Sequence, residues 1–133
     1  MDIIAAVQAE LAVLSKQDVD GVLSFYSDDV VFVDISMDEP LVGKPAMRGF
    51  MQGLYKAFPD LRVENVNAFG DDVHVAAEYD LLGTNEGPLD GQPPTGKSFR
   101  VRAVSVYEAR SGTFVRETFY WDSASLLRQL GLA

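Results

Sequence analysis

The spacing of apolar residues changes once along this chain, near Leu61, and this change constrains the fold more than any other feature. Before Leu61 the apolar residues recur at helical intervals, as in the stripe Met47, Phe50, Met51, Leu54 and Phe58. After it, apolar and polar residues alternate, which places successive side chains on opposite faces of a strand. Helices followed by hairpin-linked strands predict an α+β domain, with the helices packed on one face of an antiparallel sheet.

Capping and turn residues set the expected bounds of these elements. We predict a first helix over residues 2–16, a short second helix capped by Asp18, a third that opens at Gly43, and a short one after Asp122. A turn is expected at Ser27-Asp28-Asp29. The expected strands cover residues 30–35, 61–69, 73–82, 99–108 and 114–121, and a long loop covers residues 84–96. The 133 residues suit a single domain over 1–133.

Composition and charge narrow the classes of partner. Eleven basic against 20 acidic residues give a formal net charge of −9. Such a surface repels a phosphate backbone, so we expect no nucleic-acid partner. No apolar run approaches the about 18 residues of a membrane helix, and the N-terminus lacks a signal-peptide pattern, so we expect no membrane partner. The absence of cysteine rules out disulfides and thiolate chemistry and fits a cytoplasmic location.

Two aspartates at strand ends are the candidate catalytic residues. Asp122 ends an aromatic strand, and a carboxylate at the rim of an apolar face is suited to general acid/base catalysis. Asp122 is equally well placed to cap the helix that follows, and one residue can do both. Asp34 ends the first strand on the face of Phe32. It is either a general base or a solvated strand end.

Strand alternation assigns further side chains to a pocket. Thr118 and Tyr120 share the face of Asp122, and Ser105 and Tyr107 are the polar candidates on the preceding long strand. The predicted ligand contacts from these patterns are Phe32, Phe50, Leu54, Tyr79, Ser105, Tyr107, Thr118 and Tyr120. The only histidine, His74, falls on the opposite face from Tyr79 without further metal ligands. We therefore expect neither a metal nor a cofactor.

Several segments resemble known families. Residues 22–30 (VLSFYSDDV), the strand end Val33-Asp34 and residues 43–47 (GKPAM) resemble the nuclear-transport-factor-2-like superfamily, over nearly the whole chain. Within it, residues 83–87 (GTNEG) and 91–97 (GQPPTGK) resemble the SnoaL-like polyketide cyclases. So do the C-terminal segments YWD, residues 120–122, and LLRQLG, residues 126–131.

The resemblance implies a fold and an activity. The fold is a cone-shaped curved antiparallel sheet with three N-terminal helices packed on its concave face. The activity is an intramolecular aldol step on a polyketide ester, with Asp122 at the position of the family's catalytic aspartate. Relatives also dimerise through the outer sheet face, on which Val104 and Val106 are apolar. Asn85 stands where relatives often carry histidine, and it is a further candidate ligand contact.

Steroid isomerases of the same fold offer a second comparison. Asp34 matches their general base, but the positions of their oxyanion hole hold Glu10 and Ser105 here. That difference disfavours isomerase chemistry.

We therefore predict an enzyme that uses carboxylate general acid/base chemistry on a small apolar or aromatic carbonyl ligand, without a cofactor. Two alternatives stay open: a non-catalytic binding module that keeps the pocket, and a relative with cofactor-free hydroxylase, epoxide hydrolase or isomerase activity. The loop over residues 84–96 is expected to act as a lid.

Overall fold

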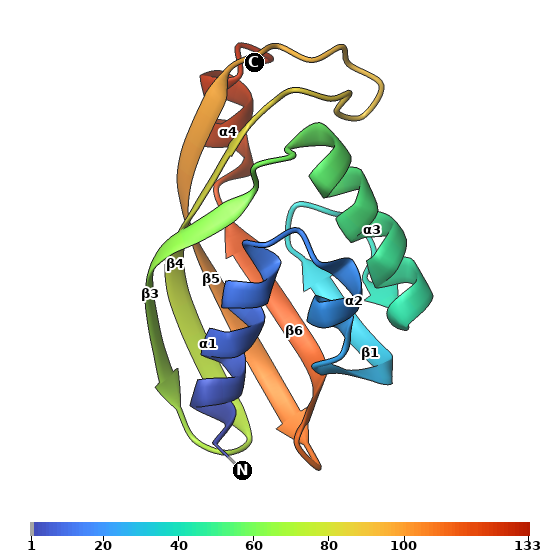
Figure 1. Cartoon of the computed structure of the whole chain (residues 1–133), viewed down its shortest axis with the longest axis vertical. Helices are drawn as coiled ribbons and strands as arrows, with labels where there is room; N and C mark the ends of the chain where they lie inside the picture. The colour runs from blue at the N-terminus through green and yellow to red at the C-terminus, as the bar shows by residue number, and fades with distance from the viewer. Residues whose placement is uncertain (1) are drawn as a thin grey trace.

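Three helices lie against one face of a curved six-stranded sheet in the computed structural model, which describes residues 2–133 (Figure 1). A fourth helix follows the last strand and contacts β5 at one end of the sheet. The helices are α1 (Ile3–Leu14), α2 (Val19–Leu23), α3 (Lys44–Ala57) and α4 (Ser123–Gln129). The expected α+β class is confirmed. Over residues 2–133, no helix is both long and apolar enough to cross a bilayer.

The first two helices begin where the sequence predicts, because aspartate side chains satisfy their free N–H groups. Asp2 Oδ1 accepts from the Ala5 N–H at 3.0 Å, and Asp18 Oδ1 accepts from the Gly21 N–H at 2.9 Å. The third helix carries Pro45 in its first turn, where no intrahelical N–H is needed.

The sheet has the order β2-β1-β6-β5-β4-β3. Its strands are β1 (Tyr26–Asp34), β2 (Leu41–Val42), β3 (Arg62–Gly70), β4 (His74–Thr84), β5 (Ser98–Arg110) and β6 (Thr113–Trp121). The run from β3 to β6 is antiparallel as predicted, but β1 pairs with β6 in parallel. The sheet is therefore mixed.

The first strand begins earlier than predicted. The expected turn at Ser27-Asp28-Asp29 is wrong, because these residues belong to β1. Pairing with β6 is nevertheless irregular between Tyr26 and Val31, so this stretch is a distortion within a strand and not a chain reversal.

A β-bulge in β6 reverses the predicted facing of its side chains. Ala109 of β5 pairs with Phe114 while the preceding Glu108 pairs with Arg116, so Val115 is an extra residue on β6. One extra residue shifts the alternation by one position. Phe114 is buried as expected, but beyond the bulge the inward residues are Glu117, Phe119 and Trp121. The predicted inward facing of Thr118, Tyr120 and Asp122 is therefore wrong.

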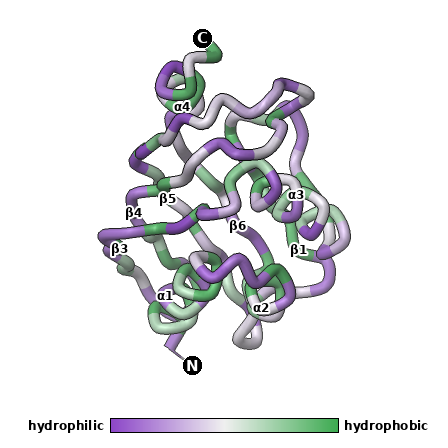
Figure 2. The backbone as a smooth tube through the Cα atoms, turned by 45° about the horizontal axis from the view of Figure 1, so that its top comes forward, coloured by the Kyte–Doolittle hydropathy of each residue, from purple (hydrophilic) through white to green (hydrophobic). Residues whose placement is uncertain are grey.

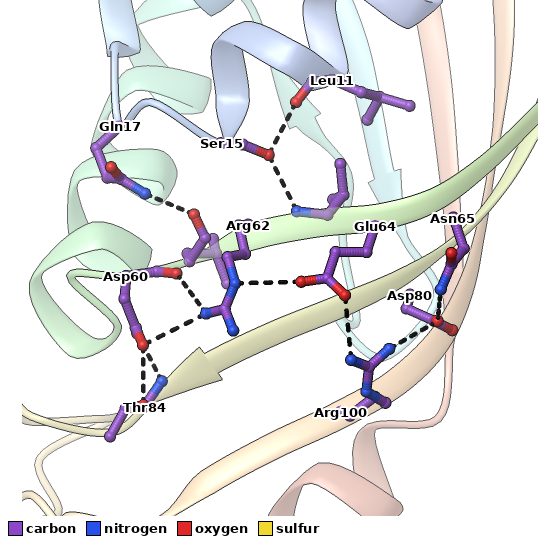
Figure 3. A network of polar contacts seen from close by, with 12 residues as sticks. Leu11, Ser15, Gln17, Asp60, Arg62, Glu64, Asn65, Asp80, Thr84 and Arg100 are labelled. Carbon is purple, nitrogen blue, oxygen red and sulfur yellow. Dashed lines mark hydrogen bonds and ion pairs between the residues drawn. The ribbon is translucent and has the colours of Figure 1, made fainter.

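Side chains after α1 tie that helix to the edge strand β3, as Figure 3 shows. The Ser15 hydroxyl donates to the Leu11 carbonyl at 3.2 Å and accepts from the Val63 N–H at 3.0 Å. The Gln17 amide donates to the Leu61 carbonyl at 2.6 Å. These bonds hold α1 over the sheet and so fix one wall of the space between helices and strands.

The outer face of the sheet carries charge at one end. Arg100 contacts Glu64 at 3.1 Å and Asp80 at 2.8 Å, and Arg102 contacts Asp80 at 3.1 Å (Figure 3 draws the Arg100 contacts). Hydrogen bonds from Asn65 and Arg102 lower the pKa of the Asp80 carboxyl. The edge strand β3 is mostly hydrophilic (Figure 2), which protects an open sheet edge from pairing with other chains.

Glycine substitutions test how α3 packs. A Cβ on Gly87 would lie 1.9 Å from the Lys56 carbonyl oxygen at the end of α3, whereas Gly49 and Gly53 have no neighbour within 4 Å of theirs. We expect Gly87→Ala to lower the free energy of unfolding by about 1–3 kcal/mol through overpacking. Gly49→Ala and Gly53→Ala should each raise it by about 0.5–1 kcal/mol, because alanine favours a helix interior. Urea denaturation measures all three, and an unchanged Gly87→Ala variant would contradict this packing.

Candidate functional site

A cavity of about 480 Å³ lies between the helices and the inner face of the sheet. Most of its lining is apolar, contributed by all four helices and by every strand except β2. The ionisable lining residues are Glu10, Tyr26, Asp34, Tyr55, Tyr79, Asp90, Tyr107 and Glu117. An apolar cavity with a few polar groups is the usual form of a small-molecule site.

Asp34 lines this cavity at the end of β1 and is 4% exposed. Its Oδ1 accepts three hydrogen bonds, from the Ser36 N–H at 2.9 Å, the Ser36 hydroxyl at 2.7 Å and the Trp121 indole N–H at 2.9 Å. Among residues 2–133, no donor bonds its Oδ2. One carboxylate oxygen is thus fixed in place, and the other remains free to accept from a ligand.

An aromatic series runs from this aspartate along the cavity wall. Trp121 stacks on Phe119 with ring centroids 5.5 Å apart, Phe119 stacks on Phe32 at 6.5 Å, and Phe32 contacts Phe50 at 5.4 Å. These rings give an apolar or aromatic ligand a flat surface beside the free oxygen of Asp34.

Asp122 is exposed and lies outside the cavity lining. Its Oδ1 accepts from the Ser125 N–H at 2.9 Å, so the side chain caps α4. The neighbouring residues Trp121 and Ser123 line the cavity instead. Of the two roles that the sequence leaves open for Asp122, the geometry shows the helix cap.

Two glutamates meet tyrosines at the most buried end of the cavity. Glu10, on α1, accepts from the Tyr107 hydroxyl at 2.7 Å, and Glu117, on β6, accepts a short hydrogen bond from the Tyr26 hydroxyl. Glu10 is 1% exposed and Glu117 is 6% exposed. Each carboxyl therefore has a phenolic donor, and both also line the cavity.

Burial changes the ionisation of this cluster. Desolvation, and then the charge of Glu117, raise the pKa of Glu10 from 4.5 to about 8. Desolvation also raises the pKa of Glu117. The same burial, with the two glutamates nearby, raises the pKa of Tyr26, Tyr79 and Tyr107, so these hydroxyls stay protonated. The raised pKa favours the protonated form of Glu10 at neutral pH.

Five of the predicted ligand contacts line the cavity: Phe32, Phe50, Leu54, Tyr79 and Tyr107. Ser105 is fully buried behind this surface and shares a 2.7 Å hydrogen bond with the Tyr79 hydroxyl. Tyr120 is 47% exposed on the outer face, and Thr118 lies on that face beside it. His74 lies on the outer face, as expected, 3.7 Å from Glu108.

Asn85 is also buried away from the cavity, where it organises the long loop. Its Nδ2 donates to the Gly87 carbonyl at 2.9 Å, and its Oδ1 accepts from the Thr95 N–H at 2.8 Å. The loop that it holds brings Leu89 and Asp90 to the cavity lining. Asn85 therefore does not line the cavity; it holds the loop that contributes two of the lining residues.

Sequence reasoning missed Glu117 and counted Glu10 only as a departure from the isomerase pattern. A signal for each was present. Glu10 follows Val7 by three residues and precedes Leu14 by four, so it lies on the apolar stripe of α1. Glu117 lies within an aromatic strand. A lone carboxylate inside an apolar pattern marks a buried acid.

Comparisons with known proteins agree with this architecture. The family model of the SnoaL-like polyketide cyclases matches residues 4–130. The cyclase aurE of Calcarisporium arbuscula is 29% identical over 105 residues, which cover 77% of this chain and 74% of that protein.

Solved structures of similar shape include a candidate hydroxylase and a candidate cyclase. AclR of Streptomyces galilaeus, a candidate hydroxylase, has 26% identity and a TM-score of 0.84, over 97% of this chain and 84% of that one. A candidate polyketide cyclase of Xanthomonas campestris has 21% identity and a TM-score of 0.86, over 93% of both chains. At 21% identity, the similarity to the Xanthomonas protein shows a shared fold.

The raised pKa of Glu10 predicts a pH dependence of stability. Unfolded Glu10 loses its proton near 4.5, but folded Glu10 keeps it to about 8. Stability should therefore fall as pH rises between these values, by up to about 1.4 kcal/mol per pH unit. Glu10→Gln should flatten this fall, and Glu86→Gln, at an exposed site, should keep it. Urea denaturation from pH 5 to 9 measures the slope. Equal slopes in the wild type and Glu10→Gln would contradict the assignment.

Proposed function

Because the chain belongs to the SnoaL-like polyketide cyclase family, we propose that it closes a ring in a small polyketide-like carbonyl compound. The proposal takes Asp34 as the general acid/base and the cavity as the substrate site. The observation that carries it is that Asp34 lines an apolar, aromatic cavity and has no donor on its Oδ2 among residues 2–133. Asp122 is left as a helix cap.

The proposed reaction is an intramolecular aldol step. Asp34 Oδ2 takes a proton from a carbon that lies between two carbonyl groups, which leaves an enolate. The enolate carbon attacks a second carbonyl carbon of the same molecule, and a carbon–carbon bond forms. The alkoxide oxygen that results takes the proton back from Asp34. Atoms balance without a cofactor, and the aspartate returns to its starting state.

The held oxygen of Asp34 supports this role. Three donors on Oδ1 fix the carboxylate orientation, so Oδ2 keeps one direction relative to the aromatic wall. A positioned base reacts faster because the reacting atoms are already aligned.

The absence of cysteine favours the cytoplasm as the place of the reaction.

A hydroxylase is the second candidate, favoured by the 26% identity with AclR. Ring closure leaves the elemental composition unchanged or removes water, whereas hydroxylation adds one oxygen atom. Mass spectrometry of the product distinguishes the two reactions.

We further propose that two copies of the chain pair through the outer sheet face. Val104 pairs with Glu78 and Tyr120, and Val106 pairs with Ala76 and Thr118, so two valines, an alanine and a tyrosine lie together across three strands, with Glu78 and Thr118 beside them. Tyr120 is 47% exposed on this area. A twofold axis through it would bury the same residues of both copies.

Asp34→Asn should slow proton abstraction strongly. A suitable probe is ethyl benzoylacetate, a 1,3-keto ester whose central hydrogens exchange in D₂O and are followed by NMR. We expect saturable acceleration by the wild type and a loss of ~10²–10⁴-fold in Asp34→Asn, the usual contribution of one acid/base group. Asp122→Asn is the matched control, because asparagine also caps helices and should leave exchange unchanged. Full activity in Asp34→Asn would refute the proposed role, and the non-catalytic binding module would then be favoured.

The pairing of copies makes a separate prediction. Sedimentation at micromolar concentration should give the mass of a dimer for the wild type and for Tyr120→Phe. Tyr120→Glu should give a monomer, because it places like charges at the shared surface. A monomeric wild type would rule out this interface.

A further inference from the structure

The buried end of the cavity holds two carboxyl groups, and its lining includes no cationic side chain among residues 2–133. Glu10 and Glu117 both line it, yet none of the lining residues from 2–133 is lysine, arginine or histidine. Buried carboxylates are ordinarily paired with a cation or a metal. No described lining side chain here is cationic, and the raised pKa of Glu10 favours its protonated form.

The polar groups around the pair come from every neighbouring element. Tyr26 is on β1, Tyr55 on α3, Tyr79 on β4 and Tyr107 on β5, and Ser105 of β5 bonds Tyr79 at 2.7 Å. All are hydroxyls, and Tyr26 and Tyr107 already donate to the carboxyls. Tyr55 donates to the Leu14 carbonyl at 2.7 Å. None of these groups supplies a positive charge.

We propose that Glu10 and Glu117 form an inner subsite that binds a neutral carbonyl or hydroxyl oxygen of the ligand and rejects a carboxylate. The protonated acid donates to such an oxygen, and the ionised one accepts from a hydroxyl. A ligand carboxylate at this end would meet a second negative charge in a dry site, without a cation to compensate.

The subsite also gives the ligand a direction. In the parallel pairing of β1 and β6, Phe32 lies opposite Glu117 and Asp34 lies opposite Phe119. Asp34 and Glu117 are therefore offset by two residues, about 6–7 Å along the strands. The aromatic residues Phe32, Phe119 and Trp121 lie on the same two strands, β1 and β6. A ligand would set its neutral oxygen against the glutamates and its reactive carbon near Asp34.

This inference deepens the proposed function by naming the chemistry of the ligand's inner end. It rests on the proposal that the cavity binds a ligand, but not on catalysis by Asp34. Binding measurements therefore test it separately from proton abstraction.

The test uses two probes of similar size, 2-acetylnaphthalene, a ketone that does not titrate, and 2-naphthoate, a carboxylate. Isothermal titration calorimetry near pH 6 should show the ketone binding at least ~100-fold more tightly to the wild type. Raising the pH to 9 should remove the proton of Glu10 and weaken ketone binding about tenfold, because a hydrogen-bond donor is lost.

Variants locate the effect. Glu10→Gln keeps a neutral donor at the site, so ketone binding should change less than about threefold between pH 6 and 9, and naphthoate should bind more tightly than to the wild type. Glu117→Gln should give the same relief of naphthoate if the Glu10 variant fails to fold. Glu86→Gln, at an exposed site, should behave as the wild type.

Three results would overturn the inference: naphthoate binding as well as the ketone, ketone binding that does not change with pH, or variants that match the wild type. Failure of both probes to bind would overturn it together with the cavity as a ligand site. Ketone selectivity with full proton exchange in Asp34→Asn would refute the proposed catalysis and leave the inner subsite intact.

Discussion

The burial of two carboxyl groups in an apolar interior is the constraint on which the rest of the site depends. Glu10 and Glu117 come from opposite layers of the domain, the first from α1 and the second from β6. An unpaired buried charge is strongly destabilising, so the fold must supply donors and keep protons at this point. Tyr26 and Tyr107 supply the donors, and the raised pKa of Glu10 keeps a proton.

The same cavity carries two kinds of carboxyl group with different surroundings. Asp34, at the end of β1, has one oxygen bonded by Ser36 and Trp121 and the other free. The glutamates are bonded by phenols in the interior, where burial raises the pKa of both carboxyls. The free oxygen of Asp34 can accept a hydrogen bond from a ligand, and a protonated glutamate can donate one at the other end of the cavity.

Much of the fold is predictable from the sequence because it depends on local signals. The caps at Asp2 and Asp18, Pro45 in the first turn of α3 and the change of spacing near Leu61 predict helices and strands close to their observed bounds. The facing of β6 was not predictable in this way. Its alternation is interrupted by the extra residue Val115, and a bulge depends on pairing with β5, which a single strand does not show.

That bulge also decided which of the predicted side chains line the cavity. It turns Glu117 inward in place of Thr118 and leaves Asp122 at the surface as a cap. The cavity positions of Phe32, Asp34 and Tyr79, on strands where the alternation holds locally, were predicted correctly. The pairing of Glu10 with Glu117 joins residues more than 100 positions apart. Only the packing of α1 on the sheet brings them together.

The central claim is that burial keeps a proton on the Glu10 carboxyl, and carbon NMR of the glutamate carboxyls tests it most directly. Titration of protein labelled with ¹³C at these carbons, with signals assigned from Glu10→Gln and Glu117→Gln, reports the protonation of each group. The structure predicts that Glu10 is protonated at pH 7 and titrates near 8. Two signals already ionised at pH 7, each titrating near its ordinary value, would contradict the account.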